Sequence, residues 1–166
     1  MDSGVAQLAY LLDESFDRND EHSLLANLRT VSSAAWAAVP PEGGRSIRDI
    51  ADHAGVAIRL YADHLFGAAT LDYLSVHKTS PGRADPATIP ALVDWIREGH
   101  RVLRTGLASL RDADLSRPAR SHWGEPAETR WLVGVIIQHN TYHAGEINHL
   151  RSMLQGDDRW PWQSGR

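Results

Sequence analysis

Two histidines four residues apart are the residues of this sequence best suited to chemistry. His139 and His143 lie in the stretch QHNTYHAGEINHL, and this spacing places both side chains on one helix face, about one turn apart. Two imidazoles so arranged can bind one metal ion. The face is otherwise apolar and includes Leu132, Ile136, Ile147 and Leu150. Both histidines are therefore predicted to point into a helical core, where rings without partners cost about 1 to 3 kcal/mol each.

A third metal ligand must come from another helix, and two histidines qualify. His53 flanks the apolar face of one predicted helix, and His100 lies within the apolar face of another. Either residue could instead be a core histidine held by hydrogen bonds, as buried polar groups usually are. Spacing alone leaves both open. The remaining histidines are predicted to lie at the surface: His22, His64, His77, His122 and His149.

Glu146 lies three residues after His143 and shares its helix face. Its carboxylate could be a fourth ligand, a hydrogen-bond acceptor that fixes the tautomer of an imidazole, or a general base. The ordinary alternative is an ion pair with an arginine such as Arg151. The sequence does not choose among these roles.

Four helical segments are predicted to position these residues. Apolar residues at helical spacing indicate a first helix from Leu8 to Ala35, broken at 17–22 and ended by Pro40-Pro41. A second helix is predicted to begin after Ser46, because Ser46 and Asp49 form a relative of the capping box, and to end near Gly67.

The second half of the chain is predicted to hold a long connection and two helices. The connection covers 68–90, where the apolar pattern is lost, with a short turn at 71–74. The third helix is predicted at 90–111 and the fourth at 128–154, followed by Gly156 as the carboxy-terminal cap. No alternating pattern typical of strands appears. These segments predict an all-α four-helix bundle, and 166 residues fit a single domain spanning 1–166.

Composition excludes several classes of function. The net charge of −4 gives no basic excess for nucleic-acid phosphates, so no nucleic-acid partner is expected. No apolar run approaches the roughly 20 residues that a membrane helix needs, and the acidic amino end does not match a signal peptide. We therefore expect a cytoplasmic protein without a membrane partner. The absence of cysteine excludes a protein thiol as nucleophile or ligand.

Two segments carry a resemblance to a known family. SIRDIADHAG at the second helix and HNTYHAGEINHLRSMLQGD near the carboxy end resemble the DinB-like (DinB/YfiT) superfamily of metalloenzymes. The resemblance covers nearly the whole chain and implies a four-helix bundle that binds one divalent ion, such as nickel or zinc. Carried over by position, the ligands are His53, His139 and His143, which favours His53 over His100. Where many members have Gln, this chain has Glu146.

The resemblance also implies a class of activity. Characterised relatives include transferases and isomerases that use mycothiol, bacillithiol or glutathione, so the chain is expected to be a metal-dependent enzyme that activates a small-molecule thiol. One alternative is a metal-dependent hydrolase in which Glu146 is the base. Another is a metal-binding or stress-response protein without turnover. Family members often pair through helix faces, and Trp95 could anchor such a homodimer.

Aromatic residues near the fourth helix also leave two interpretations. Trp123, which precedes this helix, could line the mouth of the metal site or pack over the end of the bundle. The bulk of a tryptophan ring favours the second interpretation. Tyr142 is adjacent to His143 but is predicted to point to a different face.

Overall fold

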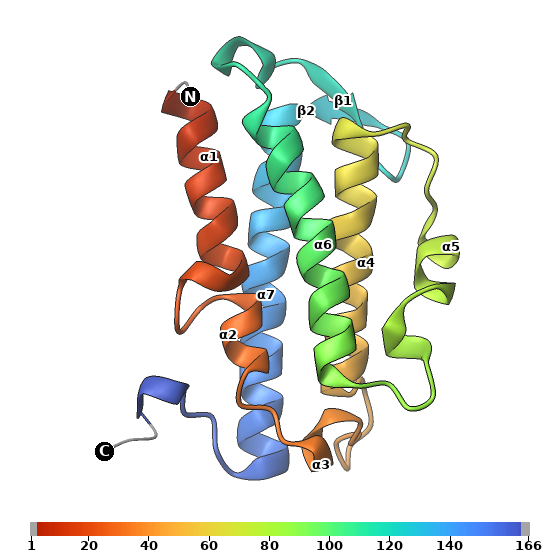
Figure 1. Cartoon of the computed structure of the whole chain (residues 1–166), viewed down its shortest axis with the longest axis vertical. Helices are drawn as coiled ribbons and strands as arrows, with labels where there is room; N and C mark the ends of the chain where they lie inside the picture. Colours follow the sequence, from red (N-terminus) through yellow and green to blue (C-terminus); the bar gives the residue numbers. More distant parts are fainter. Residues whose placement is uncertain (1–2, 164–166) are drawn as a thin grey trace.

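The computed structural model describes residues 3–163, so the ends of the predicted domain, 1–2 and 164–166, lie outside the described residues. The longest described helices are α1 (Ser3–Asp13), α4 (Ile47–Phe66), α6 (Ile89–Ala108) and α7 (Thr129–Gln155). They run side by side along the long axis of the molecule (Figure 1). Buried apolar side chains from all four form one core. The helical character predicted from the sequence is confirmed.

The amino-terminal helix is interrupted as predicted. The chain leaves α1 through a π-helical turn, η1 (Glu14–Arg18), and becomes helical again in α2 (Leu24–Leu28) and α3 (Ser33–Trp36). Ser23 and Ser32 cap the two short helices, because each side chain accepts a hydrogen bond from a backbone N–H three residues on. The predicted single resumed segment is therefore two short helices.

The start of α4 follows its predicted capping box. The Asp49 N–H donates to the Ser46 hydroxyl at 3.1 Å, and the Ser46 N–H donates back to the Asp49 carboxylate at 3.3 Å. The helix ends before Gly67, as predicted. This cap fixes the amino-terminal end of the helix that carries His53.

The long connection after α4 contains more helix than predicted. In place of a turn at 71–74 it forms α5 (Tyr73–Lys78) and a 3₁₀ turn, η2 (Pro81–Arg83). The carboxylate of Asp63 accepts the backbone N–H groups of Thr70 and Leu71 at 2.8 and 2.9 Å. The connection is thus tied back to α4.

Glycine allows α4 and α6 to pack closely. A Cβ on Gly106 of α6 would lie 2.3 Å from the ring of Phe66, and a Cβ on Gly55 of α4 would lie 2.6 Å from the ring of Trp95. Both distances are too short for any larger residue without movement. The helix-weakening glycine in α6 therefore has a packing role.

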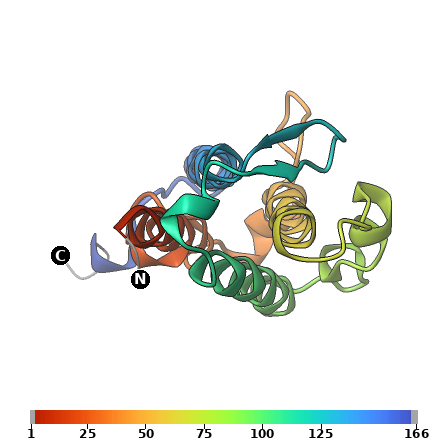
Figure 2. The same cartoon turned by 90° about the horizontal axis from the view of Figure 1, so that it is seen from above.

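A short hairpin precedes α7, and its presence corrects the expectation of no strands. After the 3₁₀ turn η3 (Asp112–Asp114), β1 (Pro118–Arg120) pairs antiparallel with β2 (Pro126–Glu128), so that Ala119 faces Ala127. Three-residue strands are too short to give an alternating pattern. The hairpin reaches from α7 toward the end of α4 (Figure 2).

The carboxy-terminal end of α7 is also as predicted. Gly156 adopts the left-handed conformation that suits a helix cap, with φ of 66°. A last 3₁₀ turn, η4, covers Pro161–Gln163. Across residues 3–163, no helix combines the length and apolar character that crossing a membrane would require.

Candidate metal centre

The structure brings His53, His139 and His143 together. His53 lies in the second turn of α4, and the other two lie in the middle of α7. The Nε2 atom of His139 is 3.2 Å from that of His53 and 3.1 Å from that of His143. One nitrogen from each ring lies within 4.8 Å of the other two. The three histidines thus point their outer nitrogens at a common point.

This spacing suits a shared cation. Ligand nitrogens about 2.0 to 2.1 Å from a tetrahedral ion lie roughly 3.3 Å apart, close to the two measured separations. Three neutral imidazoles with converging lone pairs repel one another unless a proton or a cation lies between them. The residues present therefore fit one divalent ion, and three protein ligands leave a coordination position open.

Burial keeps the three imidazoles neutral. It lowers the pKa of His139 to about 3, and the nearby charges of His143 and His53 add to this effect. Burial also lowers the pKa of His53 and of His143, although Glu146 opposes the shift in His143. Neutral rings are the form that binds metal, so the site is in its ligating state near pH 7.

Glu146 lies behind one ligand. Its carboxylate is 2.5 Å from Nδ1 of His143, and it also accepts two hydrogen bonds from Arg45 at 2.9 and 3.0 Å. The predicted alternative of an ion pair with an arginine is therefore present, but the arginine is Arg45 and not Arg151, whose guanidinium donates to Asn148 and to the Arg159 carbonyl. The contact with Glu146 favours a proton on Nδ1 of His143, which turns its Nε2 lone pair toward the site.

Tyr73 is a neighbour of the site that sequence reasoning missed. Its hydroxyl lies 3.4 Å from Nδ1 of His53, the ring nitrogen that does not face His139. Tyr73 begins α5, inside the connection where no periodic pattern marked any residue. Nδ1 of His139 is buried and has no hydrogen-bond partner among the described residues.

His100, the rival third ligand, lies elsewhere. Its ring stacks on Phe16 with centroids 3.7 Å apart, and its Nε2 is 3.2 Å from a carboxylate oxygen of Asp13. It is buried between α6 and η1, so it is a core histidine with partners of its own. Geometry therefore groups His53, and not His100, with the pair on α7.

The remaining histidines divide into two groups. His22, His122 and His149 are exposed, as predicted. The surface prediction is wrong for His64 and His77, which are partly buried. His64 lies 2.9 Å from a backbone carbonyl, and His77 lies 3.2 Å from a carboxylate oxygen of a buried aspartate.

That aspartate, Asp52, precedes His53 and anchors the long connection to α4. It is buried and accepts hydrogen bonds from Ser80 and, at 2.9 Å, from Arg83. The two interactions tie η2 against α4 beside the metal site. Because Asp52 points to a different side of α4, it holds the surroundings of His53 and is not part of the histidine group.

Of two aromatic residues considered in the sequence, Tyr142 lies beside the site and Trp123 lies at the hairpin. Tyr142 is exposed, as predicted, although its ring centroid lies 5.1 Å from that of His143. Trp123 is 45% exposed at the hairpin tip and contacts the rings of Tyr61 and Trp131. These contacts lie at the hairpin end of α4 and α7, in agreement with the interpretation that Trp123 packs over the end of the bundle, although nearly half of its side chain remains exposed.

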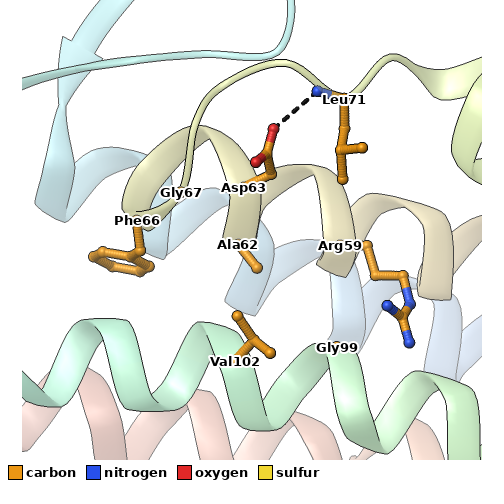
Figure 3. Close-up of a pocket in the computed structure, with 8 residues that line it drawn as sticks. All are labelled: Arg59, Ala62, Asp63, Phe66, Gly67, Leu71, Gly99 and Val102. Atoms are coloured by element: carbon orange, nitrogen blue, oxygen red, sulfur yellow. Dashed lines mark hydrogen bonds between the residues drawn. The ribbon is translucent and has the colours of Figure 1, made fainter.

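A pocket on another side of α4 lacks this chemistry. It has a volume of about 230 Å³, lies between α4 and α6, and is lined by none of the three histidines (Figure 3). Its acidic residue, Asp63, turns toward the backbone N–H of Leu71 and is committed to holding the connection. We assign this pocket no reactive role.

Comparison with known families agrees with the geometry. A sequence model of a protein family, described as the DinB superfamily, matches residues 16–147. The matched stretch contains all three converging histidines and Glu146. A comparison with curated proteins found no match.

Proposed function

We propose, because the chain belongs to the DinB superfamily, that it is a metal-dependent enzyme that activates a small-molecule thiol. His53, His139 and His143 would hold one divalent ion, with nickel or zinc as the expected metal. The observation that carries the proposal is the convergence of three Nε2 atoms at 3.1 and 3.2 Å. In this proposal α1, α4, α6 and α7 are the four helices of the expected bundle.

The chemistry divides between the ion and the chain. When bound, the ion would act as a Lewis acid and lower the pKa of a thiol that coordinates it. The chain has no cysteine, so the thiol must belong to a substrate or cosubstrate such as mycothiol, bacillithiol or glutathione. The chain would orient this molecule and keep the three imidazoles neutral.

Glu146 is a positioning residue in this proposal. Its carboxylate contacts Nδ1 of His143, and Nδ1 lies on the other side of the ring from the converging nitrogens. The two hydrogen bonds from Arg45 hold it there. A carboxylate in this place orients a ligand and raises its basicity. The hydrolase alternative, with Glu146 as base, requires the side chain to leave both partners.

The homodimer remains a prediction. Trp95 is partly buried within the chain, where Arg59 lies over its ring with the guanidinium carbon 4.3 Å from the centroid. Trp95 therefore has an intrachain packing role whether or not it also contacts a second copy. A mass of 18.4 kDa by light scattering at micromolar concentration would reject the dimer.

The thiol proposal can be tested by spectroscopy. Cobalt-substituted protein is titrated with mycothiol, bacillithiol and glutathione, and the visible and near-ultraviolet spectrum is followed. We expect at least one thiol to change the spectrum, because a thiolate that joins the three imidazoles changes the ligand field of cobalt. His139→Ala is the control and should show no protein-dependent change.

Two results would contradict parts of the proposal. Cobalt bound by the wild-type chain, with no response to any thiol and no ester hydrolysis, would reject thiol activation and favour the metal-binding protein without turnover. Ester hydrolysis by the wild type that is lost in metal-saturated Glu146→Gln, together with no thiol response, would favour the hydrolase.

A further inference from the structure

Arg59 of α4 is a partly buried cation with no acidic partner among residues 3–163. Its Nη2 donates to the backbone carbonyl of Trp95 at 2.9 Å, and its guanidinium carbon lies 4.3 Å from the centroid of the Trp95 ring. Nε is buried, whereas Nη1 reaches solvent, and neither atom has a hydrogen-bond partner in the described part of the chain. The two N–H groups of Nη1 are therefore left for a ligand.

The charge of Arg59 is only weakly balanced by the protein. Glu98, the acid whose charge acts on it, is held by Arg101 through hydrogen bonds of 2.6 and 2.8 Å. Burial lowers the pKa of Arg59, and Glu98 opposes this shift only in part. Cations that leave water are usually paired with an anion. An anion beside this guanidinium would therefore meet a charge that is already in place.

A pocket of about 360 Å³ opens beside Arg59, between α4, α5 and α6. Arg59 and Leu71 also line the pocket of about 230 Å³ described above, so the two pockets meet at these side chains. Figure 3 shows the Arg59 side chain extending from α4 toward α6. We call the larger one the Arg59 pocket, and its described lining is Arg59, Leu71, Ser75, Val76, Thr79 and Trp95.

The lining of the Arg59 pocket combines one positive charge with apolar walls. Leu71, Val76 and Trp95 supply the walls, and no acidic residue is among the described residues that line it. The hydroxyls of Ser75 and Thr79 donate to backbone carbonyls of their own helix, at 2.8 and 3.0 Å. The volume falls in the range of small-molecule sites, which are mostly apolar with a few polar anchors. The pocket thus suits an anion with an uncharged body.

We propose that the Arg59 pocket binds a small monocarboxylate with an aromatic or other apolar body. The carboxylate accepts hydrogen bonds from Nη1 of Arg59, and the body packs against Leu71 and Val76. A carboxylate fits better than a phosphate, because a single guanidinium would leave a dianion half neutralised. None of the three converging histidines lines the pocket, so this site is separate from the metal centre.

Two naphthalene compounds that differ only in charge test the proposal. 2-Naphthoate and 2-naphthamide are titrated into chelator-treated protein, so that no bound metal can capture the carboxylate. The side-chain N–H signals of Arg59 and Trp95 are followed by nuclear magnetic resonance. Both should shift, and that of Trp131, which lies on α7, should not. We expect 2-naphthoate to bind roughly tenfold more tightly than 2-naphthamide, the size of one charge-assisted hydrogen bond.

Two variants separate the charge from the pocket. Arg59→Met keeps the apolar stem but removes the charge, and should reduce the preference for 2-naphthoate to about twofold or less. Thr79→Trp keeps Arg59 but fills the pocket, and should weaken both compounds. Arg130→Met is the matched control, because Arg130 pairs with Glu128 at the start of α7 and its loss changes the net charge equally. It should keep the full preference.

Four results would overturn the proposal. The first is equal binding of the two compounds by the wild type, and the second is a preference that survives in Arg59→Met. The third is 2-naphthoate binding that Thr79→Trp leaves unchanged, which would place the compound outside the pocket. The fourth is a Trp95 signal that moves on dilution without ligand, which would assign the pocket to a second copy of the chain. Because the protein is metal-free throughout, failure of the metal centre would change none of these results.

Discussion

Two regions of this molecule bury histidine on predicted core faces, and they use it in opposite ways. His100 stacks on Phe16, and its Nε2 lies against the carboxylate of Asp13, so the ring contacts protein groups other than histidine. His53, His139 and His143 instead point nitrogens at one another. The comparison teaches that burial alone does not identify a ligand. A candidate metal ligand is distinguished by a ring nitrogen that faces the ring nitrogens of other histidines. The Nε2 of a core histidine such as His100 faces a hydrogen-bond partner instead.

The sharpest test of this comparison is metal content. Protein purified without chelator should contain close to one divalent ion per chain, and His139→Ala or His143→Ala should remove it. His53→Ala should lower the affinity by more than roughly 100-fold, since even changes behind a ligand cost 10- to 100-fold. His100→Ala should leave the affinity nearly unchanged. Elemental analysis after dialysis measures the metal that each variant retains. If His100→Ala lost more metal than His53→Ala, the assignment of His53 as a ligand would be refuted.

Stability in chelator should show the opposite ranking. His100→Ala should lower the free energy of unfolding by about 1 to 3 kcal/mol, because it removes a buried ring contact and a hydrogen-bond partner of Asp13. His139→Ala should cost less, because in the metal-free protein the Nε2 of His139 faces only the nitrogens of two other neutral imidazoles. Urea denaturation of metal-free proteins measures both values. A larger loss in His139→Ala would break the comparison.

The pH dependence of the metal-free protein should report the same difference. The pKa of His139 is about 3 when folded, against an ordinary value of 6.5, so the unfolded chain binds the proton more tightly. Stability should therefore fall as pH drops below 6.5, with His139 contributing on the order of 2 kcal/mol of loss at pH 5. His139→Gln should flatten this slope. Urea denaturation between pH 5 and 7 measures this slope. If the slope of His139→Gln equalled that of the wild type, the His139 ring would be able to take up a proton in the folded protein.

The smallest expected effect concerns Glu146, whose carboxylate contacts Nδ1 of His143. Glu146→Gln should weaken metal affinity about tenfold, because the amide still accepts a hydrogen bond from Nδ1 but no longer carries charge. Arg45→Ala should weaken it less, since Arg45 touches only the carboxylate and not the ring. Competition with a colour-changing chelator measures both variants. Equal affinities for wild type and Glu146→Gln would remove Glu146 from any positioning role.

Much of the site could be predicted from sequence where the pattern is local. The pair His139 and His143 follows from a four-residue spacing, and the start of α4 follows from Ser46 and Asp49. Both features depend on contacts within one turn of helix. The choice of His53 over His100 needed the family resemblance, because both residues lie at core-like positions and only packing between helices separates them.

Other features could not be predicted, because they depend on chain segments without periodicity. Tyr73 reaches His53 from α5, and Arg45 reaches Glu146 from the loop before α4. Both partners are distant in sequence from the residues they contact. The strands β1 and β2 escaped notice because three residues are too few for alternation. The buried Asp52 likewise gave no signal, since its partners come from several places along the connection after α4.

The close packing of α4 on α6 at Gly55 and Gly106 bears on how quickly the chain could exchange an ion. This packing places α4, and His53 with it, through contacts that involve no ligand. The conformational entropy needed to bring the ligands together is then lost during folding, before the ion binds. Metal capture is therefore expected to be a rapid, reversible equilibrium of an already folded chain. A chelator should withdraw the ion without unfolding the protein, at a rate independent of the unfolding rate.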